Sequence, residues 1–162
     1  MKAILAAIDF SPVSDLVVIE AAAMARALRG KLVLLTVLVE PVYVQGFAPP
    51  QKTIAKITVA NERAVRQRLT AMQQTLQSEI LPVETVVRRG NAAYHIMEEA
   101  AEHDATYIVI GSHGHTAFYD LILGGTSQTV LKQARLPVVV IPPKMRKPRK
   151  SKPTSAAASV RK

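Results

Sequence analysis

Tyr107-Ile108-Val109-Ile110 is a short apolar run that leads directly into Gly111-Ser112-His113-Gly114. The run has the length of a buried strand, and the glycines predict a loop at its carboxyl end. After nine intervening residues, Gly124-Gly125-Thr126-Ser127 precedes a predicted helix at residues 128–133. Glycine allows a ligand to approach bare N–H groups, and the unpaired amides of a helix amino terminus favour an anion. The two clusters together predict a phosphate-binding loop.

Apolar runs of strand length alternate with helical patterns along the chain. The predicted strands are Ile4–Ile8, Leu32–Val39, Val83–Val87, Tyr107–Ile110 and Val138–Ile141. The predicted helices run from Ser11-Pro12 to a closing Gly30, from Thr53 to Ser78, from the N-cap Asn91 to Glu102, and onward from Ser127. In the second helix the inner stripe consists of Ile57, Val65, Leu69, Met72 and Leu76. This alternation predicts an α/β fold: a doubly wound, five-stranded parallel sheet with helices on both faces.

The expected strand order is 3-2-1-4-5, which places the first and fourth strands side by side. Sheets of this kind bind ligands beyond the carboxyl ends of the strands, where the strand order reverses. Asp9 follows the first strand and Gly111 follows the fourth, so this order brings both residues to one crevice. Asp9 also has a local alternative role, as a cap of the helix that begins near Pro12.

The positive charge is concentrated at the carboxyl terminus. The net charge is +9, yet residues 144–162 hold eight of the 21 lysines and arginines and none of the 12 acids. Residues 1–143 therefore hold 13 basic and 12 acidic side chains. We expect one folded domain over residues 1–143 and a disordered tail over residues 144–162, because the tail has few apolar residues. Two interpretations of the tail stay open: weak contacts to nucleic acid or anionic surfaces, and a solubilising appendage.

Several segments together resemble one known family. They are Ile4 to Ser11, Leu35-Thr36-Val37, Arg89-Gly90-Asn91, the pattern Gly111-x-x-Gly114-x9-Gly124, and Leu136 to Pro142. In this order they resemble a universal stress protein of the ATP-binding branch. The resemblance implies an adenine nucleotide, ATP or AMP, with the glycine stretch around its ribose and phosphates. Carried over to this chain, it implicates Asp9, the backbone of Val37, Gly111, Gly114 and Gly124.

One position departs from the family pattern. Gly125 stands where the family has a hydroxyl residue after the last glycine, and the nearest hydroxyls are those of Thr126 and Ser127. The backbone amides of Gly125 and Thr126 remain available to a phosphate. Gly125, Thr126, Ser127 and, in the same loop, His115 complete the candidate contacts to the nucleotide. Discrimination between ATP and AMP stays open, because one side-chain donor is displaced.

Metal and enzyme chemistry have less support in the sequence. His113 and His115 have no third ligand in view, which favours a solvated pair over a metal site. No Gly-x4-Gly-Lys-Ser/Thr loop is present, and Asp9 is the carboxylate nearest the expected phosphates, where Mg²⁺ is a further candidate. We therefore expect a stress-response protein that acts as a nucleotide-dependent regulatory or interaction module. The alternatives are a slow ATPase or nucleotidyl transferase, and an interaction protein that binds no nucleotide.

The last predicted strand and the amino terminus carry two more expectations. Val138–Ile141 is apolar, lies at an edge in the order 3-2-1-4-5, and an apolar edge invites pairing. The family resemblance implies a homodimer through this strand. The first apolar run reaches Asp9 too soon for a signal peptide or a membrane span, and the chain has no cysteine, so we expect a cytoplasmic protein.

Overall fold

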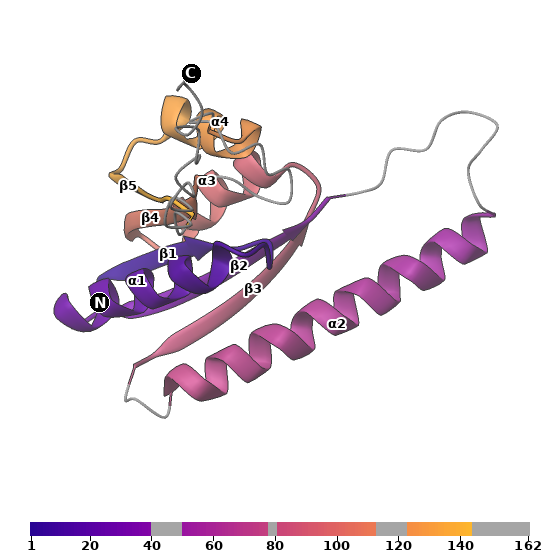
Figure 1. The fold of residues 1–162 in the computed structure, drawn as a ribbon, viewed down its shortest axis with the longest axis horizontal. Coiled ribbons are helices and arrows are strands. Elements are labelled where there is room, and N and C mark those ends of the chain that lie inside the picture. The colour runs from indigo at the N-terminus through magenta and orange to yellow at the C-terminus, as the bar shows by residue number, and fades with distance from the viewer. Residues whose placement is uncertain (40–49, 78–80, 113–122, 144–162) are drawn as a thin grey trace, which may run out of the picture.

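The computed structural model describes residues 1–39, 50–77, 81–112 and 123–143, and strands alternate with helices along these residues (Figure 1). In chain order the elements are β1 (Ala3–Ala7), α1 (Ser14–Ala27), β2 (Lys31–Leu38), α2 (Gln51–Gln77), β3 (Val83–Arg89), α3 (Ala92–Glu102), β4 (Ala105–Gly111), α4 (Gly125–Gln133) and β5 (Val138–Ile141). The predicted basic tail, residues 144–162, lies outside the described residues. Within the described ranges, none of the helices combines the length and the hydrophobicity that a membrane span requires.

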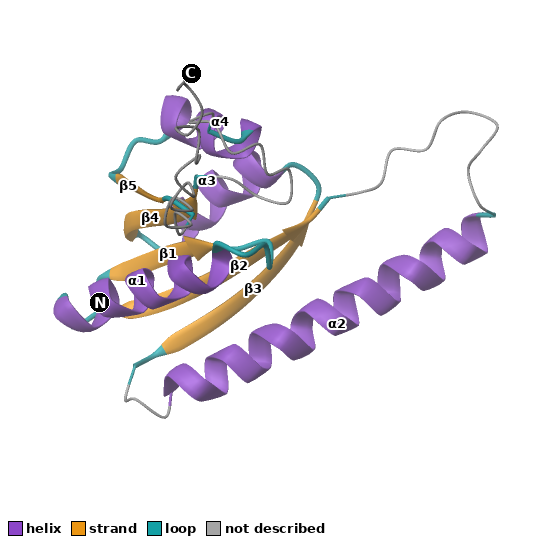
Figure 2. Cartoon of the chain, viewed as in Figure 1, coloured by secondary structure: helices purple, strands orange, loops and turns teal. Residues whose placement is uncertain are grey.

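The five strands form one parallel sheet in the order β3-β2-β1-β4-β5, which confirms the predicted fold and topology. β1 lies at the centre, with Leu5 beside Val33 of β2 on one side and Ile108 of β4 on the other. The strand order therefore reverses between β1 and β4. Figure 2 shows helices on both sides of this sheet.

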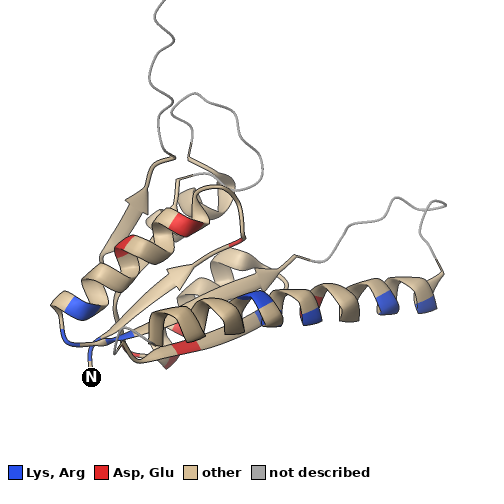
Figure 3. Ribbon diagram, turned by 60° about the horizontal axis from the view of Figure 1, so that its bottom comes forward, with Lys and Arg blue, Asp and Glu red and all other residues tan. Residues whose placement is uncertain are grey.

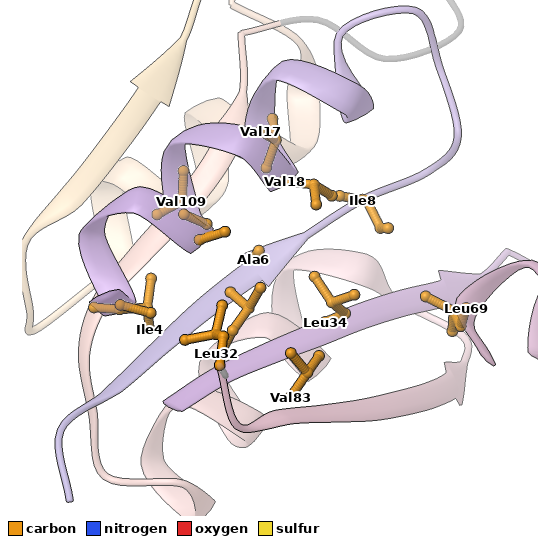
Figure 4. Packing of buried hydrophobic residues seen from close by; sticks show 14 of the residues in the cluster. Ile4, Ala6, Ile8, Val17, Val18, Leu32, Leu34, Leu69, Val83 and Val109 are labelled. Atoms are coloured by element: carbon orange, nitrogen blue, oxygen red, sulfur yellow. The ribbon is translucent and has the colours of Figure 1, made fainter. Parts of the chain in front are cut away.

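Alternate side chains of the strands enter two separate cores. Ile4 and Ala6 of β1 belong to the cluster beneath α1 and α2, while Ala3 and Leu5 belong to the cluster beneath α3 and α4. Figure 4 shows the first cluster, in which side chains of β1 and β2 meet Val17 and Val18 of α1. A parallel strand with both faces covered is apolar throughout, which explains the uninterrupted runs in the sequence.

Only the carboxyl half of α2 packs against the sheet. Leu69 is buried, and Val65, Met72 and Leu76 are partly buried against the same core, as predicted. The prediction for Ile57 is wrong, because its side chain is 47% exposed. A helix of 27 residues is about 40 Å long, whereas the seven residues of β3 span about 23 Å. The amino half of α2 therefore extends beyond the sheet (Figure 1).

Some helix boundaries differ from the predictions. α1 begins at Ser14 rather than at Ser11-Pro12, and α4 begins at Gly125, before Ser127. Asn91 caps α3 as expected, since its side-chain oxygen accepts a hydrogen bond from the Tyr94 amide at 2.9 Å.

Gly30 follows α1 as predicted, but it lacks the left-handed backbone that a glycine commonly adopts at the end of a helix. The residue with a left-handed backbone after α1 is Arg29, at φ 51°. Gly30 is required by close approach, because a Cβ there would lie 2.3 Å from the carbonyl oxygen of Lys2.

Candidate functional site

A cavity of about 470 Å³ lies at the carboxyl ends of β1, β2 and β4, where the strand order reverses. Its volume is in the range of small-molecule sites. Seven of the residues predicted from the sequence line it: Asp9, Val37, Gly111, Gly124, Gly125, Thr126 and Ser127. The other two, Gly114 and His115, lie outside the described residues. The topology thus brings together residues from four separate segments of the chain.

Asp9 stands at the exposed rim of the cavity and shapes the turn into α1. Its Oδ1 accepts hydrogen bonds from the Ser11 amide at 2.9 Å and from the Ser14 hydroxyl at 3.1 Å. The local capping role considered from the sequence is absent in this form, because the N-cap of α1 is Val13 and no side chain caps its amides; Asp9 shapes the turn before the helix instead. These two bonds also fix the direction of the carboxylate at the rim.

Phe10 holds the same turn from the side of α2. Its φ of 60° is left-handed, which is uncommon for a bulky residue. The guanidinium carbon of Arg68 lies 4.0 Å from the centroid of the Phe10 ring, a cation–π contact. The loop after β1 is therefore restrained by both α1 and α2.

The two glycine clusters meet through short hydrogen bonds. The Gly124 amide donates to the Ser112 carbonyl at 2.9 Å, and the Ser127 hydroxyl donates to the Gly111 carbonyl at 2.8 Å. The first turn of α4 consequently borders the cavity, with its amides at the positive end of the helix dipole. The proton of the Ser127 hydroxyl is already used, so the side-chain donor left in this turn is the exposed Thr126.

Thr36 is a residue of the cavity that was not selected from the sequence. Its side chain is 3% exposed, and among the described residues its hydroxyl has no hydrogen-bond partner. A buried hydroxyl without a partner costs about 1–3 kcal/mol, which a ligand hydrogen bond would offset. The available signal was a single hydroxyl residue within the otherwise apolar run Leu32–Val39.

Apolar side chains form the remaining wall of the cavity. They come from both layers of helices and from the strands, and include Ile8, Val13, Leu35, Val65, Ile96 and Ile110. A cavity that combines an apolar wall with backbone amides at a helix amino terminus suits a ligand with a flat apolar part and an anionic part.

The corner between β3 and α3 adjoins the cavity and is tightly bonded. Gly90 has a φ of 114°, and its amide donates to the Leu38 carbonyl at 2.9 Å. His95 bridges this corner, with Nε2 2.8 Å from the Arg89 carbonyl and Nδ1 2.9 Å from a Glu98 carboxylate oxygen. The hydrogen bond from His95 lowers the pKa of Glu98. The corner thereby holds the start of α3 beside the ligand space.

Arg89 also ties β3 to α2. Its guanidinium binds the carboxylate of Glu62, and Nη2 of Arg66 lies 2.7 Å from the same carboxylate. The hydrogen bonds from these two arginines lower the pKa of Glu62, and Arg89 has the larger effect. No group of three His, Asp or Glu side chains within the described residues is placed to hold a metal ion.

The chain is similar to proteins of one known family. The model of the universal stress protein family matches residues 1–142. Universal stress protein Rv2005c of Mycobacterium tuberculosis is 31% identical over 141 residues, which is 85% of this chain and 44% of that protein. A universal stress protein of Mycolicibacterium smegmatis is 40% identical over 58 residues, 36% of this chain and 19% of that one. The chain spans less than half the length of these curated relatives.

Solved structures share the fold. Hypothetical protein MJ0577 superimposes with a TM-score of 0.77 at 21% identity, covering 90% of this chain and 98% of that one. Universal stress protein UspA from Lactobacillus plantarum gives 0.76 at 21% identity, with coverages of 86% and 97%. A universal stress protein in complex with cAMP gives 0.54 at 20% identity, with coverages of 86% and 95%.

Proposed function

Since the chain belongs to the universal stress protein family, we propose that it is of the ATP-binding branch and binds ATP or AMP in the strand-end cavity. The observation that carries this proposal is the convergence of seven predicted contact residues, from four separate segments, on one cavity of suitable volume. A structural relative in complex with cAMP gives further support. The protein then acts as a stress-response module whose interactions depend on nucleotide occupancy.

Each part of the cavity has a role in this proposal. The amides of Gly125, Thr126 and Ser127 at the start of α4 meet the phosphates. The Thr36 hydroxyl and the backbone of Val37 contact the nucleoside. Asp9 is the one carboxylate among the described residues that line the cavity, so it is also the side chain nearest to any Mg²⁺ that accompanies ATP.

Thr36 gives a test in which stability and affinity change in opposite directions. Replacing Thr36 by Val keeps the shape of the side chain and removes an unpaired buried hydroxyl, so the ligand-free protein should be as stable or slightly more stable. The affinity for the nucleotide should fall about tenfold, because the ligand loses one hydrogen bond worth about 1.5 kcal/mol. Titration calorimetry with ATP and AMP, together with thermal unfolding, measures both quantities.

Thr85→Val is the matched control, because Thr85 lies on β3 outside the cavity lining. Its affinity should equal that of the wild type. If neither ATP nor AMP binds the wild type at millimolar concentration, the nucleotide proposal is wrong. Equal affinities of the two valine variants would instead remove Thr36 from the site.

We further propose a homodimer through β5. Among the strands that the structure describes, β5 pairs with β4 alone, and all four of its side chains are partly exposed. An open apolar edge is well suited to pairing with a second copy about a two-fold axis.

Light scattering tests this proposal. At tens of micromolar the wild type should give twice the mass of the chain, and Val139→Lys should give monomers or precipitate. A monomeric wild type would contradict this proposal, whereas Ile19→Lys, at an exposed position of α1, should leave the dimer intact.

A further inference from the structure

Four cations form a line along the exposed side of α2. Lys52, Lys56, Arg63 and Arg66 are all exposed, and we call this set the cation stripe. At 100° and 1.5 Å per residue, they fall within a sector of about 80° and extend over about 21 Å of the helix. Figure 3 shows lysines and arginines as blue bands along this helix.

Little negative charge balances the stripe. Glu62 is the one acidic residue of α2, and it is shared between Arg66 and Arg89. Among the described residues, no ion pair involves Lys52, Lys56 or Arg63. Residues 1–143 are almost neutral in sum, but five of their 13 lysines and arginines lie on α2, against one acid.

Helix stability explains Arg66, which pairs with Glu62 one turn away, but it does not explain Lys52. The amino-terminal end of a helix carries a partial positive charge, which favours acids in the first turn. α2 has no acid in its first turn and has Lys52 as its second residue. The amino half of α2 also extends beyond the sheet, so the lysines do not cover a core. An external polyanion would supply the favourable interaction that the chain itself lacks.

The surroundings of the stripe favour phosphates over lipid tails. A shallow hollow of about 610 Å³ runs along the same helix. It is lined by Arg63 and Arg66, by the one acid Glu62, by the uncharged polar residues Gln67, Thr70 and Gln74, and by Val59 and Ala71. A helix that inserts into a membrane surface needs a broad apolar face. On α2, the residues that follow the cations along the hollow are hydrogen-bond donors: Gln67, Thr70 and Gln74.

We propose that the cation stripe of α2 binds the phosphate backbone of duplex nucleic acid, without reading its sequence. About 21 Å of duplex carries about 12 phosphates, enough to meet all four cations. The amino half of α2 is clear of the sheet, and the major groove is wide enough to admit a helix. This interaction is independent of the strand-end cavity, which Lys56 and Arg63 do not line.

Two charge-matched double variants of the full chain test the proposal. Lys56→Gln with Arg63→Gln removes two charges from the stripe, and Lys132→Gln with Arg135→Gln removes two exposed charges elsewhere. Glutamine keeps the helix propensity. Fluorescence anisotropy with a 20-base-pair duplex of mixed sequence, in NaCl from 50 to 200 mM, gives the affinity and its salt dependence. The carboxyl-terminal tail is the same in all three proteins.

The stripe variant should bind at least tenfold more weakly at 0.1 M NaCl. Its slope of log K against log salt should be less steep by about 1.8, which corresponds to two lost phosphate contacts. The control should change the slope by less than about 0.5. Equal losses in both variants, or no binding by the wild type, would overturn the proposal. The proposal would also be overturned if the wild type bound vesicles of phosphatidylserine and phosphatidylcholine through the stripe but did not bind the duplex.

Discussion

The strand-end cavity and the cation stripe both offer positive charge to an anion, yet they are constructed differently. The cavity draws on the ends of β1, β2 and β4 and on the first turn of α4, and its donors are largely backbone amides. The stripe lies on one helix, and its donors are exposed side chains. The first site depends on the complete sheet, whereas the second depends on the spacing of cations within 15 consecutive residues.

This difference affects how each ligand is coupled to folding. A ligand that binds only the folded chain stabilises it, but a ligand that also binds the unfolded chain does so much less. Nucleotide binding in the cavity requires tertiary structure. Phosphate binding by lysines and arginines does not, because the unfolded chain carries the same cations.

The largest expected effect follows from this coupling. ATP or AMP at one hundred times its dissociation constant should raise the free energy of unfolding by about 2.7 kcal/mol. A duplex at the same multiple of its own dissociation constant should raise it by less than half of that amount. Chemical unfolding at 0.1 M salt measures both values. Equal stabilisation by the two ligands would show that the duplex, like the nucleotide, recognises a folded surface, and the comparison would fail.

The fold was accessible from the sequence because its signals are local. Four of the five strands are apolar runs, and Gly30, Gly90, Asn91 and Gly111 mark breaks between elements. Boundaries were harder to predict, because they depend on contacts between distant residues. Gly30, for example, is needed for its approach to Lys2, and the left-handed residue after α1 is Arg29.

The candidate site was accessible only in part. The glycine clusters and Asp9 lie in recognisable motifs, so their position at one cavity was expected. The Arg68 contact with Phe10 arises from packing between elements, and no spacing in the sequence indicates it. Thr36 is visible in the sequence as one hydroxyl residue in an apolar run, but only the structure shows that this hydroxyl has no hydrogen-bond partner among the described residues. The stripe was missed for a different reason: a near-neutral sum over residues 1–143 conceals the separation of charge, and the predicted inner position of Ile57 assumed that the whole of α2 covers the sheet.

A smaller effect is expected from Gly125, the position that departs from the family pattern. A Cβ at Gly125 would meet no atom within 4 Å, so a serine fits without displacing its neighbours. Gly125→Ser should raise the affinity for ATP about tenfold, because a hydroxyl hydrogen bond to a charged phosphate is worth about 1.5 kcal/mol. Gly125→Ala controls for the change in backbone freedom. A serine variant that binds like the alanine variant would show that the phosphates lie beyond reach of residue 125, and neither variant should alter duplex binding.

The smallest effect concerns Glu62, which lies beside the cation stripe and engages Arg66 and Arg89. Glu62→Gln removes a charge that repels phosphates and releases both arginines, so duplex affinity at pH 7 should rise, by less than tenfold. Glu84→Gln is the control, because Glu84 pairs with Lys31 at 2.9 Å and lies on β3 rather than on α2. An unchanged affinity in Glu62→Gln would place the duplex away from this part of α2.

The same variant has a signature in the dependence of stability on pH. Arg89 and Arg66 lower the pKa of Glu62 in the folded chain, so its carboxylate stabilises the fold above the ordinary carboxyl pKa of 4.5. That contribution is lost as the pH falls through the lowered pKa. The wild type should therefore be slightly more stable than Glu62→Gln at pH 7, and the difference should disappear in strong acid. The difference is small because the pair is exposed to solvent, and thermal unfolding from pH 7 to pH 3 follows it. A difference that persists unchanged at pH 3 would mean that the glutamine acts through packing of α2 rather than through the charge of Glu62.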